Sequence, residues 1–132
     1  MTILIALTAV SLVLGLSGVA HSDTLFTPAL RADQQNDLIA CDIVNVSQRT
    51  HTARIILRDK GGDALFDSGE FPLAPGATNG LASVIPGAGG ESTTYGICQF
   101  ILSGGGRDVR ATGSVVTQSA GVPRTSVVLR AD

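Results

Sequence analysis

The sequence predicts an all-β fold, an antiparallel β-sandwich of seven or eight short strands with one disulfide, preceded by a signal peptide. The first observation behind this prediction is the composition, in which 16 glycines accompany many valine, threonine and serine residues, a mixture that favours strands and turns. The second is the spacing of apolar residues, which alternate over short segments that end at glycine-containing turns. The third is the pair of cysteines, Cys41 and Cys98, each of which lies in one of these apolar segments.

The N-terminal segment has the features of a secretory signal peptide, to which we assign residues 1–22. Residues 3–16 form a nearly unbroken apolar run, and small residues follow before the first charge at Asp23. The small-residue rule for cleavage is met after Ala20 and also after Ser22, and both positions stay open. An uncleaved leader would instead be a membrane anchor, although the apolar run is shorter than the roughly 20 residues that a spanning helix needs. We therefore expect a secreted or periplasmic protein.

Residues 23–37 are expected to form an extended lead-in or an edge strand, because they are mostly polar and include a proline. Residues 38–132 are expected to form the sandwich domain. The first strand of this domain, residues 38–46, is apolar on both faces, which is typical of a strand in the middle of a sheet.

The clearest alternation runs over residues 52–58. It predicts that Ala53, Ile55 and Leu57 face the core and that Ile56 faces outward. A strand that is half buried in this way belongs to a sheet with one face on the core.

A turn at residues 59–63, with two adjacent glycines, is expected to start a return strand that is broken by a bulge at Ser68 and Gly69. Residues 85–92 are rich in glycine and form the longest predicted loop. Further short strands are expected at residues 78–84, 93–102, 109–117 and 125–129.

The two cysteines are predicted to form a disulfide, because thiols in an exported chain usually pair in the oxidising compartment that they reach. A redox-active or metal-binding pair would favour Cys-x-x-Cys spacing, whereas Cys41 and Cys98 are far apart in the sequence. The bridge would therefore tie an early strand to a late one.

Short strands joined by glycine turns, with one early and one late cysteine, resemble immunoglobulin-like domains, in which a disulfide joins the two facing sheets. The chain resembles in particular the small exported immunoglobulin-like β-sandwich proteins of bacteria that have no assigned activity. It departs from true immunoglobulin domains because it contains no tryptophan and because Tyr95 precedes Cys98 by three positions instead of two. The chain also resembles chaperone–usher pilins, but more loosely, because it lacks the aromatic C-terminal signature of that family.

Two sets of residues are candidate metal ligands, and neither set is favoured. Cleavage at the first of the two positions would place His21 at the N-terminus, where its amine and ring nitrogen suit Cu(II), with His51 as a third nitrogen ligand. Asp59, Asp63 and Asp67 carry oxygen ligands of the kind that calcium prefers, but their spacing does not match an EF-hand loop.

Other functional patterns are weak. The triplet that starts at Asn45 matches an N-glycosylation acceptor, although asparagine at the end of a strand is also common turn chemistry. The net charge is −2 and no segment clusters basic residues with aromatic ones, which argues against nucleic-acid binding. No catalytic motif is evident.

The sequence therefore favours a secreted structural or binding module that acts through surface or edge-strand contacts, with no cofactor and no catalytic chemistry. The expected partner is a protein or a cell surface, or a second copy of the chain, with membrane contact only if the leader stays uncleaved. Two alternatives come from other classes: an exported copper-binding protein that uses His21 with His51, and a subunit of an extracellular fibre.

Overall fold

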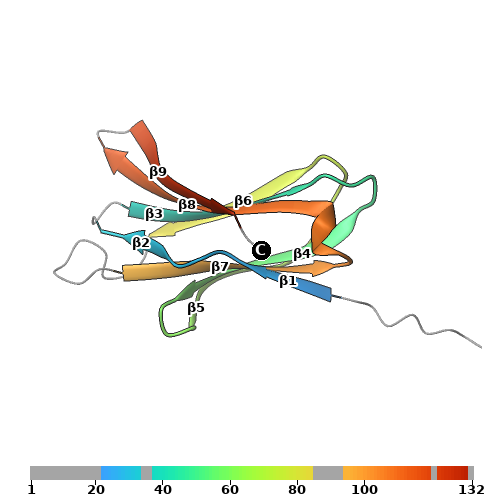
Figure 1. The fold of residues 1–132 in the computed structure, drawn as a ribbon, viewed down its shortest axis with the longest axis horizontal. Helices are drawn as coiled ribbons and strands as arrows, with labels where there is room; N and C mark the ends of the chain where they lie inside the picture. Colours follow the sequence, from blue (N-terminus) through green and yellow to red (C-terminus); the bar gives the residue numbers. More distant parts are fainter. Residues whose placement is uncertain (1–21, 34–36, 85–93, 120–121, 131–132) are drawn as a thin grey trace, which may run out of the picture.

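Two antiparallel β-sheets lie one above the other in the computed structural model of this chain (Figure 1). The structure describes residues 22–33, 37–84, 94–119 and 122–130, so the predicted leader, except Ser22, and the whole predicted loop at residues 85–92 lie outside the described residues. Within this part the elements are, in chain order, β1 (Ser22–Phe26), β2 (Leu30–Ala32), β3 (Asp37–Asn45), β4 (His51–Asp59), β5 (Ala64–Leu73), β6 (Thr78–Val84), β7 (Thr94–Ser103), the 3-10 helix η1 (Gly106–Asp108), β8 (Val109–Ser119) and β9 (Val122–Arg130).

The strands divide into a sheet of five and a sheet of four. The first sheet has the order β1-β7-β4-β5, with β2 also paired to β7, and the second has the order β6-β3-β8-β9. Every strand pair is antiparallel. The prediction of an all-β, antiparallel structure is thus confirmed, with more strands than expected because the lead-in contributes two.

The lead-in forms edge strands that help to build the core. Both β1 and β2 pair with the same side of β7, and the side chains of Leu30 and Ala32 are fully buried. Between the two strands, Thr27 N donates to Cys98 O and Cys98 N donates to Thr27 Oγ1, each at 3.0 Å. These bonds continue the pairing through the bend before Pro28.

Strand β3 is the central strand that its sequence predicts, since it pairs with β6 on one side and β8 on the other. Ile39, Cys41 and Ile43 are buried toward the first sheet. Cys41 forms the predicted disulfide with Cys98 of β7, across a Cα–Cα distance of 5.7 Å. The cross-link therefore joins the two sheets through the middle of the core.

Strand β4 follows its predicted alternation, with Ala53, Ile55 and Leu57 in the core, but Ile56 on the opposite face is buried as well. Ile56 points away from the core and is still buried, at 4% exposed. Its partners in register are Asp67 and Gln99, which bond to the arginines two positions before and after it in β4. These long side chains shield Ile56 from solvent.

The bulge predicted in β5 is present. Two residues of β5 lie between Asp67 and Glu70, whereas only one residue of β4 lies between their partners Arg54 and Ile56. Gly69 in the bulge adopts a positive φ of 67°. The Oγ of Ser68 accepts the N–H of Ile55 at 2.8 Å, which satisfies a donor that the bulge takes out of the ladder.

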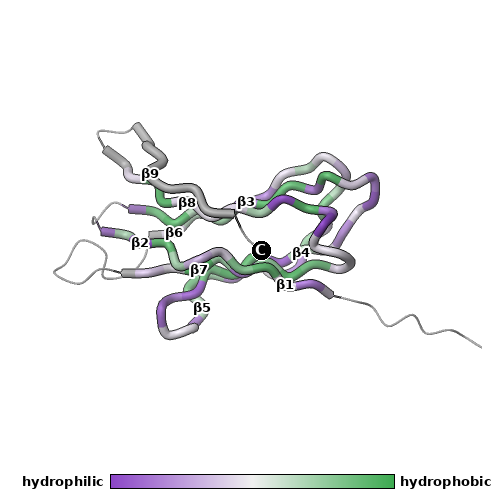
Figure 2. Tube along the Cα trace, in the orientation of Figure 1, coloured by the Kyte–Doolittle hydropathy of each residue, from purple (hydrophilic) through white to green (hydrophobic). Residues whose placement is uncertain are grey.

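The hydrophobic core lies between the two layers. Figure 2 shows hydrophobic residues concentrated along β3, β4 and β7, with hydrophilic residues at the turns. No helix in the described residues has the length and apolar character needed to cross a membrane. The core consists of Leu30, Ala32, Ile39, Cys41, Ile43, Ala53, Ile55, Leu57, Leu73, Cys98, Phe100, Leu102, Val109, Ala111 and Val115.

Candidate functional site

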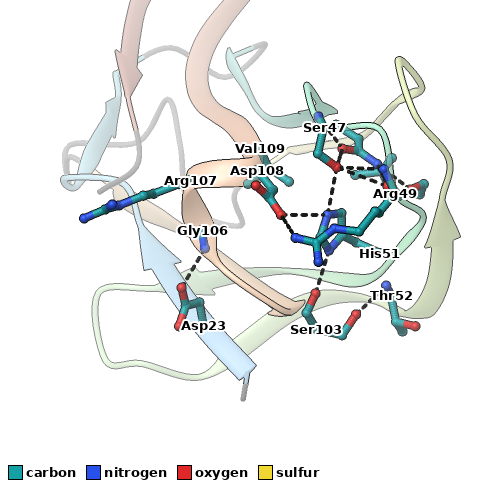
Figure 3. A network of polar contacts seen from close by, with 12 residues as sticks. Asp23, Ser47, Arg49, His51, Thr52, Ser103, Gly106, Arg107, Asp108 and Val109 are labelled. Carbon is teal, nitrogen blue, oxygen red and sulfur yellow. Dashed lines mark hydrogen bonds and ion pairs between the residues drawn. The ribbon is translucent and has the colours of Figure 1, made fainter. Parts of the chain in front are cut away.

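A network of polar side chains closes the end of the molecule at which β1 begins (Figure 3). It joins three parts of the chain: the β3–β4 turn, the connection between β7 and β8 that contains η1, and the start of β1. Because His51 lies at its centre, this network is where a reactive group or a metal ligand would be sought first.

His51 is 5% exposed, and both of its ring nitrogens have partners. Its Nδ1 lies 2.7 Å from the carbonyl oxygen of Ser103, so in the neutral ring Nδ1 carries the proton and donates it. Its Nε2 is then an acceptor for the Oγ of Ser47, at 3.0 Å. The carboxylate of Asp108 lies 3.3 Å from the same Nε2.

Asn45 holds the β3–β4 turn from inside. Its Nδ2 donates to the carbonyl oxygens of Arg49 at 2.6 Å and Leu73 at 2.9 Å, while its Oδ1 accepts from the N–H and the hydroxyl of Ser47. The side chain is 0% exposed. The amide that a glycan would need is therefore already used, and the acceptor triplet acts here as turn chemistry.

The short helix η1 connects the network to β1. The Asp108 carboxylate accepts from Arg49 Nη2 at 2.9 Å, and its backbone oxygen accepts from Val46 N at 2.9 Å. At the other end of the helix, Gly106 N donates to Asp23 Oδ2 at 2.6 Å. One three-residue helix thus fixes both the β3–β4 turn and the first strand.

The arrangement differs from a catalytic triad in the position of its acid. In a triad the carboxylate binds the ring nitrogen opposite the nucleophile, whereas here Asp108 and Ser47 share Nε2 and a backbone carbonyl holds Nδ1. The single proton of the Ser47 hydroxyl also has Asn45 Oδ1, at 2.8 Å, as a competing acceptor. The network is organised to join loops, which indicates a structural role.

Replacement of the buried amide is expected to destabilise the protein. Asn45→Ala removes two donors and one acceptor, and it leaves the carbonyls of Arg49 and Leu73 without this partner. We expect a loss of about 2 kcal/mol in the free energy of unfolding, measured by urea denaturation. Asn79→Ala is the control, because Asn79 is exposed and its side chain accepts the N–H of the next residue. Equal losses in the two variants would contradict this account.

Of the two candidate copper ligands, His21 lies outside the described residues. His51 is described, and Ser103 and Ser47 occupy its two nitrogens. A metal at His51 would have to displace one of these partners from a nearly buried ring.

The candidate calcium ligands are used for turn formation. Asp59 Oδ1 accepts from the N–H groups of Gly61 and Asp63, at 2.8 and 2.9 Å, in the β4–β5 turn. Asp67 forms an ion pair with Arg54 and caps the bulge. Among the described residues, no group of three or more His, Cys, Asp and Glu side chains is placed to hold a metal ion.

Two aspartates have displaced pKa values of opposite sign. The hydrogen bond from Arg54, then the N–H of Gly69, lowers the pKa of Asp67 to about 2. Partial burial raises the pKa of Asp42 above the ordinary value of 3.8. Asp42 lies in the middle of β3 on its outward face, and no hydrogen bond or ion pair reaches it from the described part of the chain.

These shifts predict opposite effects of pH on stability. The carboxylate of Asp67 is stabilised in the fold, so its contribution is present above about pH 4 and is lost as the pH falls through about 2. Asp42 favours its protonated form in the fold, so its effect is most favourable at low pH and is lost as the pH rises through the raised pKa. Carboxyl ¹³C NMR is expected to show Asp67 titrating below Asp42. The reverse order would refute both assignments.

A second candidate site is one of the two edges of the four-stranded sheet. Strand β6 forms this edge and pairs with β3 over seven residues without a register shift. Beside it, a shallow hollow of about 320 Å³ opens on the outer face of the sheet. The hollow is lined by Asp42, Ile43, Val44, Thr78, Arg110 and Thr112.

Comparison with known proteins supports the fold alone. No family model matches the chain, and no curated protein matches it. Among solved structures, Thermotoga maritima 1070 is similar with a TM-score of 0.54 and 11% sequence identity, over 83% of this chain and 91% of that one. At this identity the similarity concerns the arrangement of strands and says nothing about activity.

Proposed function

We propose that this protein is an exported binding module that takes up an extended segment of a partner at the edge strand β6, along residues 78–82. Strand addition of this kind uses backbone hydrogen bonds for affinity and side chains on alternate positions for specificity. The module needs no catalytic group and no cofactor.

The observation that carries this proposal is that β6 lacks the features that usually prevent an edge strand from pairing with another chain. Natural edge strands are usually blunted by charges, prolines or bulges, which prevent pairing with another chain. Strand β6 has neither charge nor proline in its seven residues, and its register with β3 is unbroken. By contrast, the edge strand β5 has two register shifts and contains Asp67, Glu70 and Pro72.

Two features support export and an immunoglobulin-like scaffold. A fully buried disulfide between the sheets suits an oxidising compartment, in agreement with the predicted leader and a secreted or periplasmic location. The pairs β3–β6 and β4–β7, linked by that bridge, correspond to strands B–E and C–F of immunoglobulin domains. The scaffold departs from that family because β1 and β2 extend the β7 sheet, while β8 and β9 extend the β3 sheet.

The proposal is tested by panning a library of random heptapeptides against the oxidised protein, followed by ¹⁵N NMR with the selected peptides. We expect proline-free, β-prone peptides that shift the amide signals of β6. Ala82→Lys places a charge on this edge and is expected to weaken binding, whereas Ala64→Lys, at the exposed start of β5, is the matched control. Amide shifts confined to other strands, or equal effects of the two lysines, would overturn the proposal.

A further inference from the structure

The carboxylate of Asp42 lies across the neighbouring strand β6. Asp42 and Gly80 are partners in register, and a Cβ atom built on Gly80 would collide with Asp42 Oδ1 and lie 3.2 Å from Asp42 Cγ. Only glycine leaves this space open. The acid in the middle of the sheet is therefore directed over Gly80 toward the free edge.

Among the residues whose side chains the structure describes, no cation is bonded to this acid. Arg110 lines the same hollow, but its Nη1 donates to the backbone oxygens of Val109, at 3.0 Å, and Arg107, at 3.3 Å. The raised pKa of Asp42 has burial as its cause, and no charged neighbour offsets it. A partly desolvated carboxylate of this kind gains from an added cation.

From this geometry we infer that β6 binds a partner strand that carries a lysine or arginine opposite Gly80, with the Asp42 carboxylate as its acceptor. The inference rests on the proposed function, and it adds the chemistry of the partner. Neighbouring strands are spaced by about 4.8 Å, so an incoming strand would lie two spacings from β3. A long basic side chain spans that gap when the residue between is glycine.

The backbone at Gly80 is also suited to exchange of partners. Its N–H donates to Oδ1 of the adjacent Asn79 at 2.8 Å. This bond within a dipeptide satisfies the donor while the edge is free, and the carbonyl of an added strand can replace it.

Symmetric pairing of β6 with β6 of a second copy does not meet this requirement. Pairing of β6 with β6 of another copy would bring only Thr78–Val84, which contains no basic residue. Such pairing adds no cation beside Asp42 in either copy. A heterologous segment with one basic residue at the correct position is the occupant that the charge favours.

The test uses two synthetic peptides, acetyl-Thr-Val-Thr-Lys-Thr-Val-Thr-amide and its counterpart with glutamate in place of lysine. They are titrated into ¹⁵N-labelled oxidised protein at low ionic strength, with the β6 amides as the readout. Opposite charges across a strand attract and like charges repel, so we expect the lysine peptide to bind about five-fold more tightly. Binding of this peptide is also expected to lower the pKa of Asp42, followed by carboxyl ¹³C NMR.

Variants locate the source of the preference. Asp42→Asn is expected to remove most of the difference between the two peptides, whereas Asp63→Asn, an exposed acid in the β4–β5 turn, is expected to preserve it. Two results would overturn the role of Asp42 while strand addition stands. One is that both peptides shift the β6 amide signals of the wild type with equal affinity, and the other is that the two variants show the same preference between the peptides. If neither peptide shifts β6 and panning also yields none that does, strand addition itself is overturned.

Discussion

Removal of the Cys41–Cys98 bridge is expected to lower the free energy of unfolding by about 4 kcal/mol. The bridge closes a loop with a sequence separation of 57, and in the chain-entropy account the stabilisation arises because the cross-link restricts the unfolded chain. Both cysteines are 0% exposed, so the double variant Cys41→Ala/Cys98→Ala also loses packing between the sheets. Guanidinium denaturation of the oxidised protein and of the variant measures the difference.

The reduced wild-type protein separates the two contributions. It keeps both sulfur atoms in the core but lacks the cross-link, so we expect it to lose most of the same free energy. A reduced protein as stable as the oxidised one would contradict the role assigned to the bridge. A loss in the variant alone would point to packing instead.

Local patterns in the sequence predict much of the scaffold. Alternation over residues 52–58 predicts which side chains of β4 enter the core, and the pair Ser68 and Gly69 predicts the bulge in β5. The apolar character of β3 on both faces predicts its central position. These features depend on a residue and its near neighbours, which is the range over which periodicity carries information.

Long-range pairing is what the sequence does not predict. The burial of Ile56 depends on Asp67 of β5 and Gln99 of β7, which bond to arginines of β4. The position of β1 and β2 beside β7 depends on sheet topology. The network around His51 has the same origin, because Asp108 is far from Ser47 in the sequence and approaches it only through η1. The spacing of Ser47 and His51 in one turn was the only local signal of this pair.

The sequence of β6 shows neither charge nor proline, but the meaning of this composition depends on the fold. A strand of this composition in the middle of a sheet would need no explanation, because central strands are commonly uncharged. At an edge, a strand of this composition lacks the usual features that prevent pairing with another chain. The position of Asp42 beside Gly80 likewise follows from the register of two strands that are distant in sequence.

Replacement of Gly113 by valine is expected to lower the free energy of unfolding by about 3 kcal/mol. Gly113 lies opposite Cys41 in β8 and faces the core. A Cβ atom there would lie 2.6 Å from Leu30 Cδ1, 2.9 Å from Thr27 Cγ2 and 3.1 Å from Cys98 Sγ. Because two of these atoms belong to the segment that carries β1 and β2, the added side chain must push that segment away from the disulfide.

Gly105→Val is the matched control, since nothing lies within 4 Å of a Cβ atom at Gly105 and its φ is −78°. We expect it to change stability by less than about 0.5 kcal/mol. We expect Gly113→Val to increase the rate of hydrogen exchange over that of the wild type, with the largest increase at the amides of β2. Uniform loss of protection across both sheets would instead mean that the lead-in and the disulfide form one unit, in which β1 and β2 cannot loosen without the core. Equal stability of the two valine variants would mean that the close packing at Gly113 is not needed.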